Sequence, residues 1–282
     1  MDPGYKRLLA GLSPLAPIET GLPESGTPAG PVKAVMFDVY GTMFVSAAGD
    51  ISQADTKKNM DEVVAEIFDD LEISGIPPEG IYESLTQKIK QHHDTQKRAG
   101  VEFPEIEIDR LWQEILKTES VRLARQAALA FEIRTNPVYP MPGLTKLIET
   151  LKKKGVAAGI ISNAQFYTPL LFEHFTGSLP ENSWARPDLL FYSYRYGHAK
   201  PSPLLFDMAA DALWKAGIKE HETIFVGNDM LNDIYPAHNR GFQTALFAGD
   251  ARSLRLHEDD PRCKNLSPEM VITGLGRIAD IL

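Results

Sequence analysis

The sequence has little cysteine, no excess of positive charge and no long apolar run. Cys263 is the single cysteine, so an internal disulfide and a zinc site built from several cysteines are both excluded. No stretch reaches the ~20 apolar residues that a membrane-spanning helix needs. Lys and Arg total 29 against 38 Asp and Glu, a net charge of −9. Such a chain has no general attraction to nucleic acid or anionic membranes, and a site for an anionic small molecule must supply its own cations.

The first 31 residues are rich in Pro and Gly, which predicts an extended or loosely attached leader over 1–31. Lys6 and Arg7 precede a short apolar run that Pro14 and Pro17 interrupt, and this makes a poor secretory signal. Together with the lone cysteine, these features predict a protein of the cytoplasm, a reducing compartment.

The rest of the composition is that of a globular protein. Apolar residues make up 43% and charged residues 24% of the 282 residues. This length is near the upper limit for one hydrophobic core, so we expect two domains or one domain with a large insertion. The apolar run at 33–37 predicts a buried parallel strand. Helical spacing of apolar residues follows over 60–75, 81–93 and 108–133, with no convincing strand between them.

Strands and helices alternate after Pro140. The predicted strands span 156–162, 189–195, 223–227 and 243–248, and the predicted helices span 143–154, 168–175, 202–216 and 230–240. We expect a closing helix within 249–282. This alternation predicts a parallel sheet wound in right-handed units. The predicted fold is a Rossmann-like α/β core, residues 32–43 and 138–282, with an inserted all-helical cap, residues 44–137.

Polar residues follow the core strands at the edge where parallel strands end together, which is where such sheets bind ligands. The residues that would converge there are Asp38, Ser162, Asn163, Lys200, Asp229 and Asp233. Each of them singly has an ordinary structural explanation as a turn residue, a helix cap or a solvated loop residue. Because coincidences at four successive strand ends are improbable, the set predicts one active site.

The ordered set resembles the motifs of the haloacid dehalogenase-like hydrolase superfamily. The matching residues are Asp38, Gly41 and Thr42 in the first motif, Ser162 in the second, Lys200 and Pro201 in the third, and Gly227, Asp229 and Asp233 in the fourth. The helical insertion after the first motif resembles the helical cap of that superfamily. The resemblance covers nearly all of the chain after residue 32, and it implies a hydrolase with an aspartate nucleophile beneath a helical lid.

The resemblance also implies a role for each residue. Asp38 would attack the substrate and form a covalent aspartyl intermediate. Ser162 and Asn163 would donate hydrogen bonds to the oxygens of the transferred group, and Lys200 would offset its charge in the transition state.

A cofactor is implied as well. Asp38, the main-chain carbonyl of Tyr40, Asp229 and Asp233 would hold Mg²⁺, a small hard cation that prefers oxygen ligands. Asn228 stands where many phosphatases place an Asp, so the metal site could be shifted by one residue. The candidate substrate contacts flank the nucleophile and the lysine: Tyr40, Thr42 and His198.

The chain departs from the phosphatase pattern at Tyr40, where superfamily phosphatases usually carry a second Asp that acts as general acid and base. A Tyr with a pKa near ~10 is a poor base at neutral pH. Halide leaves without protonation, so an enzyme that releases it needs no acid at this position. The 2-haloacid dehalogenases of the superfamily resemble this chain at Tyr40 and at Ser162–Asn163. They use an Arg soon after the first motif, however, and the segment 43–51 contains none.

Three hypotheses remain open. We favour a Mg²⁺-dependent phosphatase of a small soluble phosphate ester, because Asp229 and Asp233 are both retained. The alternative is a metal-independent 2-haloacid dehalogenase. A catalytically degenerate binding or scaffold protein is the third, and Tyr40 is its only support. In each enzyme hypothesis the partner is a small anionic molecule, with no nucleic acid and no membrane.

Overall fold

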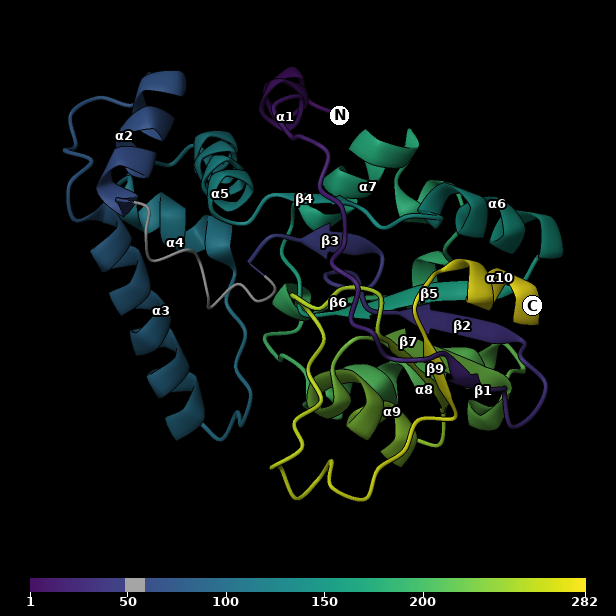
Figure 1. Ribbon diagram of the computed structural model, residues 1–282. Coiled ribbons are helices and arrows are strands. Elements are labelled where there is room, and N and C mark those ends of the chain that lie inside the picture. Colours follow the sequence, from purple (N-terminus) through teal and green to yellow (C-terminus); the bar gives the residue numbers. More distant parts are fainter. Residues whose placement is uncertain (49–58) are drawn as a thin grey trace.

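The computed structural model describes residues 1–48 and 59–282, and its centre is a seven-stranded sheet (Figure 1). The strand order is β1-β9-β8-β7-β2-β5-β6. The strands are β1 (Ser25–Gly26), β2 (Ala34–Phe37), β5 (Ala157–Ser162), β6 (Leu190–Tyr192), β7 (Thr223–Gly227), β8 (Gln243–Phe247) and β9 (Met270–Ile272). Neighbouring strands run parallel except at the edge, where β1 pairs antiparallel with β9. The predicted parallel sheet is therefore confirmed.

Helices cover both faces of this sheet. On one face lie α6 (Leu144–Lys154), α7 (Thr168–Thr176) and α10 (Gly276–Ile281), and on the other lie α8 (Leu204–Lys215) and α9 (Tyr235–Asn239) (Figure 1). Successive side chains of a strand point to opposite faces. Val35 and Phe37 of β2 accordingly pack in the cluster that contains Leu147 of α6, whereas Met36 packs in the cluster that contains Leu205 of α8. The core strand is thus buried on both sides, as its unbroken apolar run indicates.

A separate group of helices forms the insertion, at the left of Figure 1. It consists of α2 (Met60–Asp70), α3 (Ile81–Arg98), α4 (Ile108–Ile115) and α5 (Val121–Thr135). The single helix expected over 108–133 is wrong, because the chain breaks after α4. Lys117 there has a φ of 48°, and the Ser120 side chain caps the N-terminus of α5 by accepting a hydrogen bond from Leu123 N at 3.2 Å.

A short antiparallel ribbon joins the insertion to the core. It pairs β3 (Phe44–Ser46) with β4 (Val138–Pro140), and the sequence pattern did not predict either strand. The predicted helix over 230–240 is also different, since it begins with a π-helical turn, Met230–Ile234, before α9. Among the described residues, no helix is long and apolar enough to cross a membrane.

The leader is packed against the rest of the chain, which differs from the loose attachment expected from its composition. Its first helix, α1 (Pro3–Leu9), contacts α5 of the insertion and α7 of the core, and Leu9 is fully buried. Further along, Thr20 donates a hydrogen bond to Ala248 O at 2.7 Å, and β1 extends the sheet. Apolar anchors such as Leu9 therefore fix a segment whose Pro and Gly content alone indicates an irregular coil.

Candidate active site

The site begins in the turn that follows β2, the strand at which the order of the sheet reverses. Its neighbours β5 and β7 run parallel to it on either side, and open α/β sheets bind ligands at the carboxyl ends of strands at such a point. Asp38 N still donates to Val226 O at 2.9 Å, so the residue is fixed to β7. Gly41 makes the tight turn with a φ of 82°, and a Cβ there would lie 2.5 Å from the Ser253 side chain.

Asp38 is buried, with 6% of its surface exposed. Its Oδ1 accepts a hydrogen bond from Ser162 Oγ at 2.9 Å and from Lys200 Nζ at 2.6 Å. Ser162 ends β5 and Lys200 follows β6, so strand ends bring these three residues together as the sequence indicates. No group of the described residues hydrogen-bonds Asp38 Oδ2, which leaves that oxygen available for chemistry.

Lys200 links two buried carboxylates. Its ammonium lies 2.6 Å from Asp38 Oδ1 and 2.5 Å from Asp233 Oδ1. Burial alone would lower the pKa of Lys200, but the charges of Asp233 and Asp38 outweigh burial and the net pKa is raised. The pKa of Asp233 is raised by burial, against the opposing effect of Lys200. The lysine therefore remains protonated and neutralises the nucleophile region.

Asn163 holds Lys200 in place through the main chain. Its Oδ1 accepts from Lys200 N at 2.7 Å, and its Nδ2 donates to Lys200 O at 3.3 Å. Asn163 also lines the cavity above Asp38. Asn163, which the resemblance implies as a hydrogen-bond donor to the substrate, thus also positions the main chain of Lys200.

The fourth motif divides into groups that face Lys200 and groups that serve the local backbone. Asp233 contacts Lys200, whereas Asp229 Oδ1 accepts from the main-chain N–H groups of Leu231 and Asn232, both at 2.8 Å. Asp229 Oδ2 accepts from Asn232 Nδ2 at 2.8 Å, and His257 Nε2 lies 3.0 Å from Oδ1. Asp229 is therefore an N-cap whose two oxygens accept three hydrogen bonds from Leu231 and Asn232.

These contacts decide how well the predicted metal ligands fit Mg²⁺. The described part of the chain holds no cluster of three or more acidic, His or Cys side chains placed to bind a metal ion. Asp38 and Asp233 do fit, since their oxygens converge on one cationic group and Mg²⁺ commonly uses only one or two protein carboxylates. The Tyr40 carbonyl lies in the same turn as Asp38. Asp229 fits less well than Asp233, because a metal ion would compete with the three hydrogen bonds that its oxygens accept from Leu231 and Asn232.

Tyr40 lines the cavity beside the nucleophile, but its hydroxyl is engaged. Tyr40 OH and Thr168 Oγ1 lie 2.8 Å apart and share a hydrogen bond. Burial, followed by the nearby Glu132 carboxylate, raises the pKa of Tyr40 well above its usual value. The residue that replaces the usual second Asp is therefore a neutral wall of the cavity and not a base.

The two other candidate substrate contacts lie differently. Thr42 is fully buried, and its hydroxyl donates to Asn228 Oδ1 at 3.0 Å. Asn228 Nδ2 in turn donates to Ser253 O at 2.6 Å, so Thr42 and Asn228 tie the first motif to the fourth. His198 forms a backbone bridge with Pro104 and is not among the described residues that line the cavity.

Several cavity residues were not predicted from the sequence. The cavity has a volume of about 120 Å³. Beyond the predicted residues it is lined by Ser46, Asn136, Asn228, Asn232, Ser253 and Arg255. Ser46 Oγ donates to Asn136 Oδ1 at 2.8 Å, and Arg255 belongs to the loop after β8. None of these lies in a recognisable motif at a strand end except the two Asn residues of the fourth motif. Within the segment 43–51, residues 49–51 lie outside the described part of the chain.

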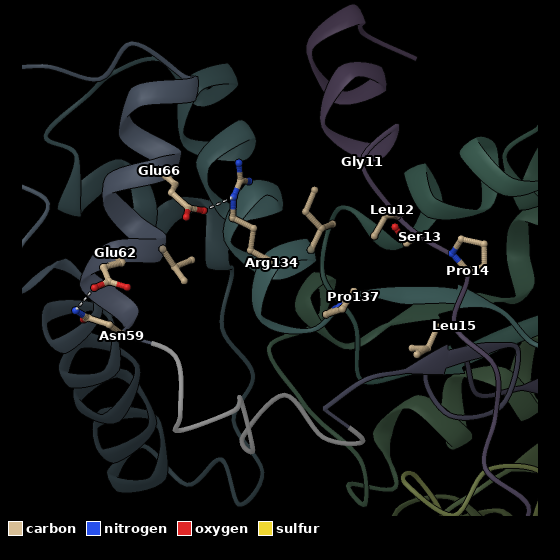
Figure 2. A pocket seen from close by; sticks show the side chains of 12 residues that line it. Gly11, Leu12, Ser13, Pro14, Leu15, Asn59, Glu62, Glu66, Arg134 and Pro137 are labelled. Atoms are coloured by element: carbon tan, nitrogen blue, oxygen red, sulfur yellow. Dashed lines mark hydrogen bonds and ion pairs between the residues drawn. The ribbon is translucent and has the colours of Figure 1, made fainter.

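A larger cavity lies elsewhere, between the leader and the helices α2 and α5 (Figure 2). It measures about 590 Å³. Its polar and charged side chains contact one another: Asn59 Nδ2 donates to Glu62 at 3.1 Å, and Arg134 lies 3.8 Å from Glu66. Asp38 does not line it, so cavity size alone does not identify the candidate active site.

Comparison with known sequences identifies one family. Residues 32–252 match the sequence model of a hydrolase family described as haloacid dehalogenase-like hydrolase, which confirms the resemblance stated from the motifs. The match extends from the start of β2 to the loop after β8. No curated protein matches the chain.

Solved structures resemble the fold. A 2-haloacid dehalogenase from Pseudomonas syringae pv. tomato superposes with a TM-score of 0.53 at 18% identity, covering 89% of this chain and 97% of that one. The HAD-hydrolase YfnB of Bacillus subtilis, described as bound to magnesium, gives 0.50 at 17% identity, with 90% and 99% covered. Identities this low show a shared fold and leave the substrate open.

Proposed function

The chain belongs to the haloacid dehalogenase-like hydrolases, and within this family we propose that it is a phosphatase of a small soluble phosphate monoester. The observation that carries the proposal is the nucleophile itself. Asp38 is buried beside a protonated lysine, with Oδ1 held by Ser162 and Lys200 and Oδ2 directed at no protein group of the described chain. The acidic charge of the chain and its single cysteine support a small-molecule enzyme of the cytoplasm.

The residues support a two-step transfer. Asp38 Oδ2 attacks phosphorus, and the new O–P bond forms as the bond from phosphorus to the leaving oxygen breaks. Ser162 Oγ and the ammonium of Lys200, which both contact Asp38 Oδ1, would stabilise the charge on the transferred group. Water then attacks the aspartyl phosphate, which releases phosphate and restores the Asp38 carboxylate. The leaving oxygen takes its proton from solvent, because Tyr40 is engaged with Thr168.

The proposal includes a Mg²⁺ ion with two carboxylates as its side-chain ligands. Asp38 and Asp233 would hold Mg²⁺, with the Tyr40 carbonyl as a further oxygen in the same turn. When bound, the cation would reduce the repulsion between an anionic nucleophile and an anionic phosphate. Asp229 would support the site from outside it by capping the turn that carries Asp233.

The test uses an activated aryl phosphate, because such a leaving group needs no general acid and the absence of an Asp at position 40 does not limit the first step. We expect para-nitrophenyl phosphate to be hydrolysed with Mg²⁺, and the rate to fall when a chelator removes it. Excess Mg²⁺ should restore the rate. Turnover that a chelator leaves unchanged would contradict the metal assignment, and no turnover at high enzyme concentration would contradict phosphatase activity.

A 2-haloacid dehalogenase is the second candidate, and the neutral Tyr40 is the observation that favours it. In that reaction Asp38 Oδ2 attacks carbon, an ester forms as the carbon–halogen bond breaks, and water hydrolyses the ester. Halide leaves without a proton, so the engaged hydroxyl of Tyr40 carries no penalty. Chloride release from 2-chloropropionate, measured in the presence of chelator, tests this candidate directly. Its absence at high enzyme concentration would eliminate the dehalogenase.

A further inference from the structure

The cavity above Asp38 contains a second cation that none of the family motifs includes. Arg255 lies in the loop after β8 and lines the same cavity as Asp38 and Lys200. It is partly buried. Because Lys200 is already shared between Asp38 and Asp233, Arg255 is the cavity residue whose charge is left for a ligand.

The main chain fixes Arg255 at this wall. Arg255 N donates to Asn228 O at 3.0 Å, and Met230 N donates to Arg255 O at 2.9 Å. These two bonds form a parallel β-bridge between Arg255 and Asp229. Asn228 Nδ2 adds a third bond by donating to Ser253 O at 2.6 Å. Three hydrogen bonds thus join residues 253–255 of the loop to residues 228–230 of the fourth motif, and they fix the position of Arg255 relative to Asp233.

The guanidinium is also held, by carbonyl groups of its own loop. Arg255 Nη1 donates to Arg252 O at 2.7 Å and to Leu254 O at 3.0 Å. A guanidinium has five N–H donors, and these two bonds leave the donors on Nη2 and Nε without a described partner. The head group is therefore oriented in advance and retains a planar pair of donors.

The neighbouring arginines of the loop are different. Arg252 pairs with Asp250 at 3.2 Å, and Arg262 pairs with Asp260 at 2.8 Å. No carboxylate of the described residues pairs with Arg255. The Arg255 head group is therefore available to pair with an anionic ligand that enters the cavity.

From this geometry we infer that Arg255 binds a second anionic group of the substrate, a carboxylate, at a point separate from the group that reacts at Asp38. The inference rests on the proposed function and specifies its substrate class: a phosphate monoester of a small alcohol or phenol that bears a carboxylate. The planar donor pair of a guanidinium matches the two oxygens of a carboxylate. Arg255 has no described contact with Asp38, Ser162 or Lys200, so it would determine specificity and not the chemical step.

The experiment compares two substrates that differ only in the carboxylate, phenyl phosphate and meta-carboxyphenyl phosphate. The variants are Arg255→Met and Arg255→Lys, with Arg262→Met as the control from the same loop. For Arg255→Met we expect KM for the carboxylated substrate to rise about 10- to 100-fold with kcat little changed, and KM for phenyl phosphate to change much less. Arg255→Lys should recover part of the loss, since it keeps the charge but not the fork.

Binding measured without turnover separates this inference from the proposed function. Calorimetry would compare meta-carboxyphenylphosphonate with phenylphosphonate on the wild type and on Arg255→Met. A carboxylate preference that depends on Arg255 would support the inference even if no phosphate ester were hydrolysed. Equal losses on both substrates would overturn it and assign Arg255 to the reacting group. Hydrolysis with no Arg255-dependent preference would overturn it and leave the phosphatase assignment intact.

Discussion

The turn after β2 lies between two groups of buried polar side chains that are held together in different ways. The first is a charged group, Asp38, Lys200 and Asp233. Here one ammonium contacts two carboxylates at 2.6 and 2.5 Å. The opposing charges raise the pKa of Lys200 even though burial opposes it, so the lysine stays ionised at the floor of the cavity.

The second, which we call the neutral group because its hydrogen-bonding partners are uncharged, is Glu132, Asn136 and Tyr167, where the last turn of α5 meets the core. Glu132 Oε1 accepts a hydrogen bond from Asn136 Nδ2 at 3.0 Å, and the Glu132 and Tyr167 side chains hydrogen-bond each other. No cation of the described residues pairs with Glu132. Burial therefore raises the pKa of Glu132, and it raises the pKa of Tyr167 well above its usual value.

The difference shows how similar burial acts against different neighbours: nearby charges outweigh burial at Lys200, whereas burial dominates the pKa shift at Glu132 and at Asp233. Where a cation lies between carboxylates, the charge of that cation survives removal from water. Where only neutral donors surround a carboxyl, burial favours the protonated form. The neutral group thus joins the inserted helices to the core, and the charged group performs the reaction that we propose.

Removing the nucleophile tests the charged group most strongly. Asp38→Asn should lower the turnover of para-nitrophenyl phosphate by about 10³-fold or more, because an amide cannot form the covalent intermediate. The amide oxygen still accepts from Ser162 and Lys200, so the variant should remain folded by circular dichroism. The control is Asp188→Asn, which removes an exposed carboxylate paired with Arg186. Retention of most of the wild-type rate would exclude Asp38 as the nucleophile.

Removing the cation should destabilise the fold as well as stop the reaction. Lys200→Met leaves Asp38 and Asp233 buried without a partner, and breaking a buried ion pair costs about 3–5 kcal/mol. Adding Asp233→Asn should restore part of the free energy of unfolding but none of the activity. Urea denaturation measures both variants, with the exposed Lys215→Met as control. A Lys200→Met protein as stable as the wild type would show that the two carboxylates are not held by this lysine.

The neutral group should respond to pH in the opposite sense. Because the pKa of Glu132 is raised on folding, its contribution to stability is complete below its unfolded pKa and declines as pH rises through the folded pKa. Glu132→Gln does not titrate. The variant should lie within about 1 kcal/mol of the wild type at acid pH and gain relative stability towards alkaline pH.

Thermal unfolding across this pH range measures the effect, and exposed Glu149→Gln serves as the control. We expect Glu132→Gln to keep its turnover, in contrast to the variants of the charged group. A relative stability that falls with rising pH would mean that Glu132 is ionised in the folded protein. Burial would then not favour the protonated form of Glu132, and the contrast between the two groups would be lost.

The sequence predicts the charged group because the physics that unites it is simple. Apolar strands end in polar residues, and parallel strands end at one edge of the sheet. Asp38 and Ser162 therefore meet at that edge, and the loop after β6 brings Lys200 to them. The same reasoning yields the sheet but not β3 and β4, which are three residues each and depend on pairing with each other rather than on a pattern of their own.

The roles that the sequence could not assign depend on local competition or on distant segments. Asp229 has the spacing of a metal ligand, but a carboxylate that precedes free N–H groups by two and three residues also caps them, and here the cap prevails. Asn136 and Arg255 enter the cavity from an inserted helix end and from a late loop. Neither has a motif, and only the tertiary structure brings them to Asp38.

Thr42 offers the smallest and most discriminating test, because motif and structure give it different roles. The motif makes it a candidate substrate contact, whereas the structure buries it and directs its hydroxyl to Asn228. Thr42→Val removes that hydrogen bond at nearly constant volume and should cost about 1–2 kcal/mol of stability, since Asn228 Oδ1 loses its donor. KM for para-nitrophenyl phosphate should stay unchanged, as it should in the exposed control Thr145→Val. A raised KM without lost stability would instead show that Thr42 contacts the substrate, as the motif predicts, and that the cavity reaches the base of the turn.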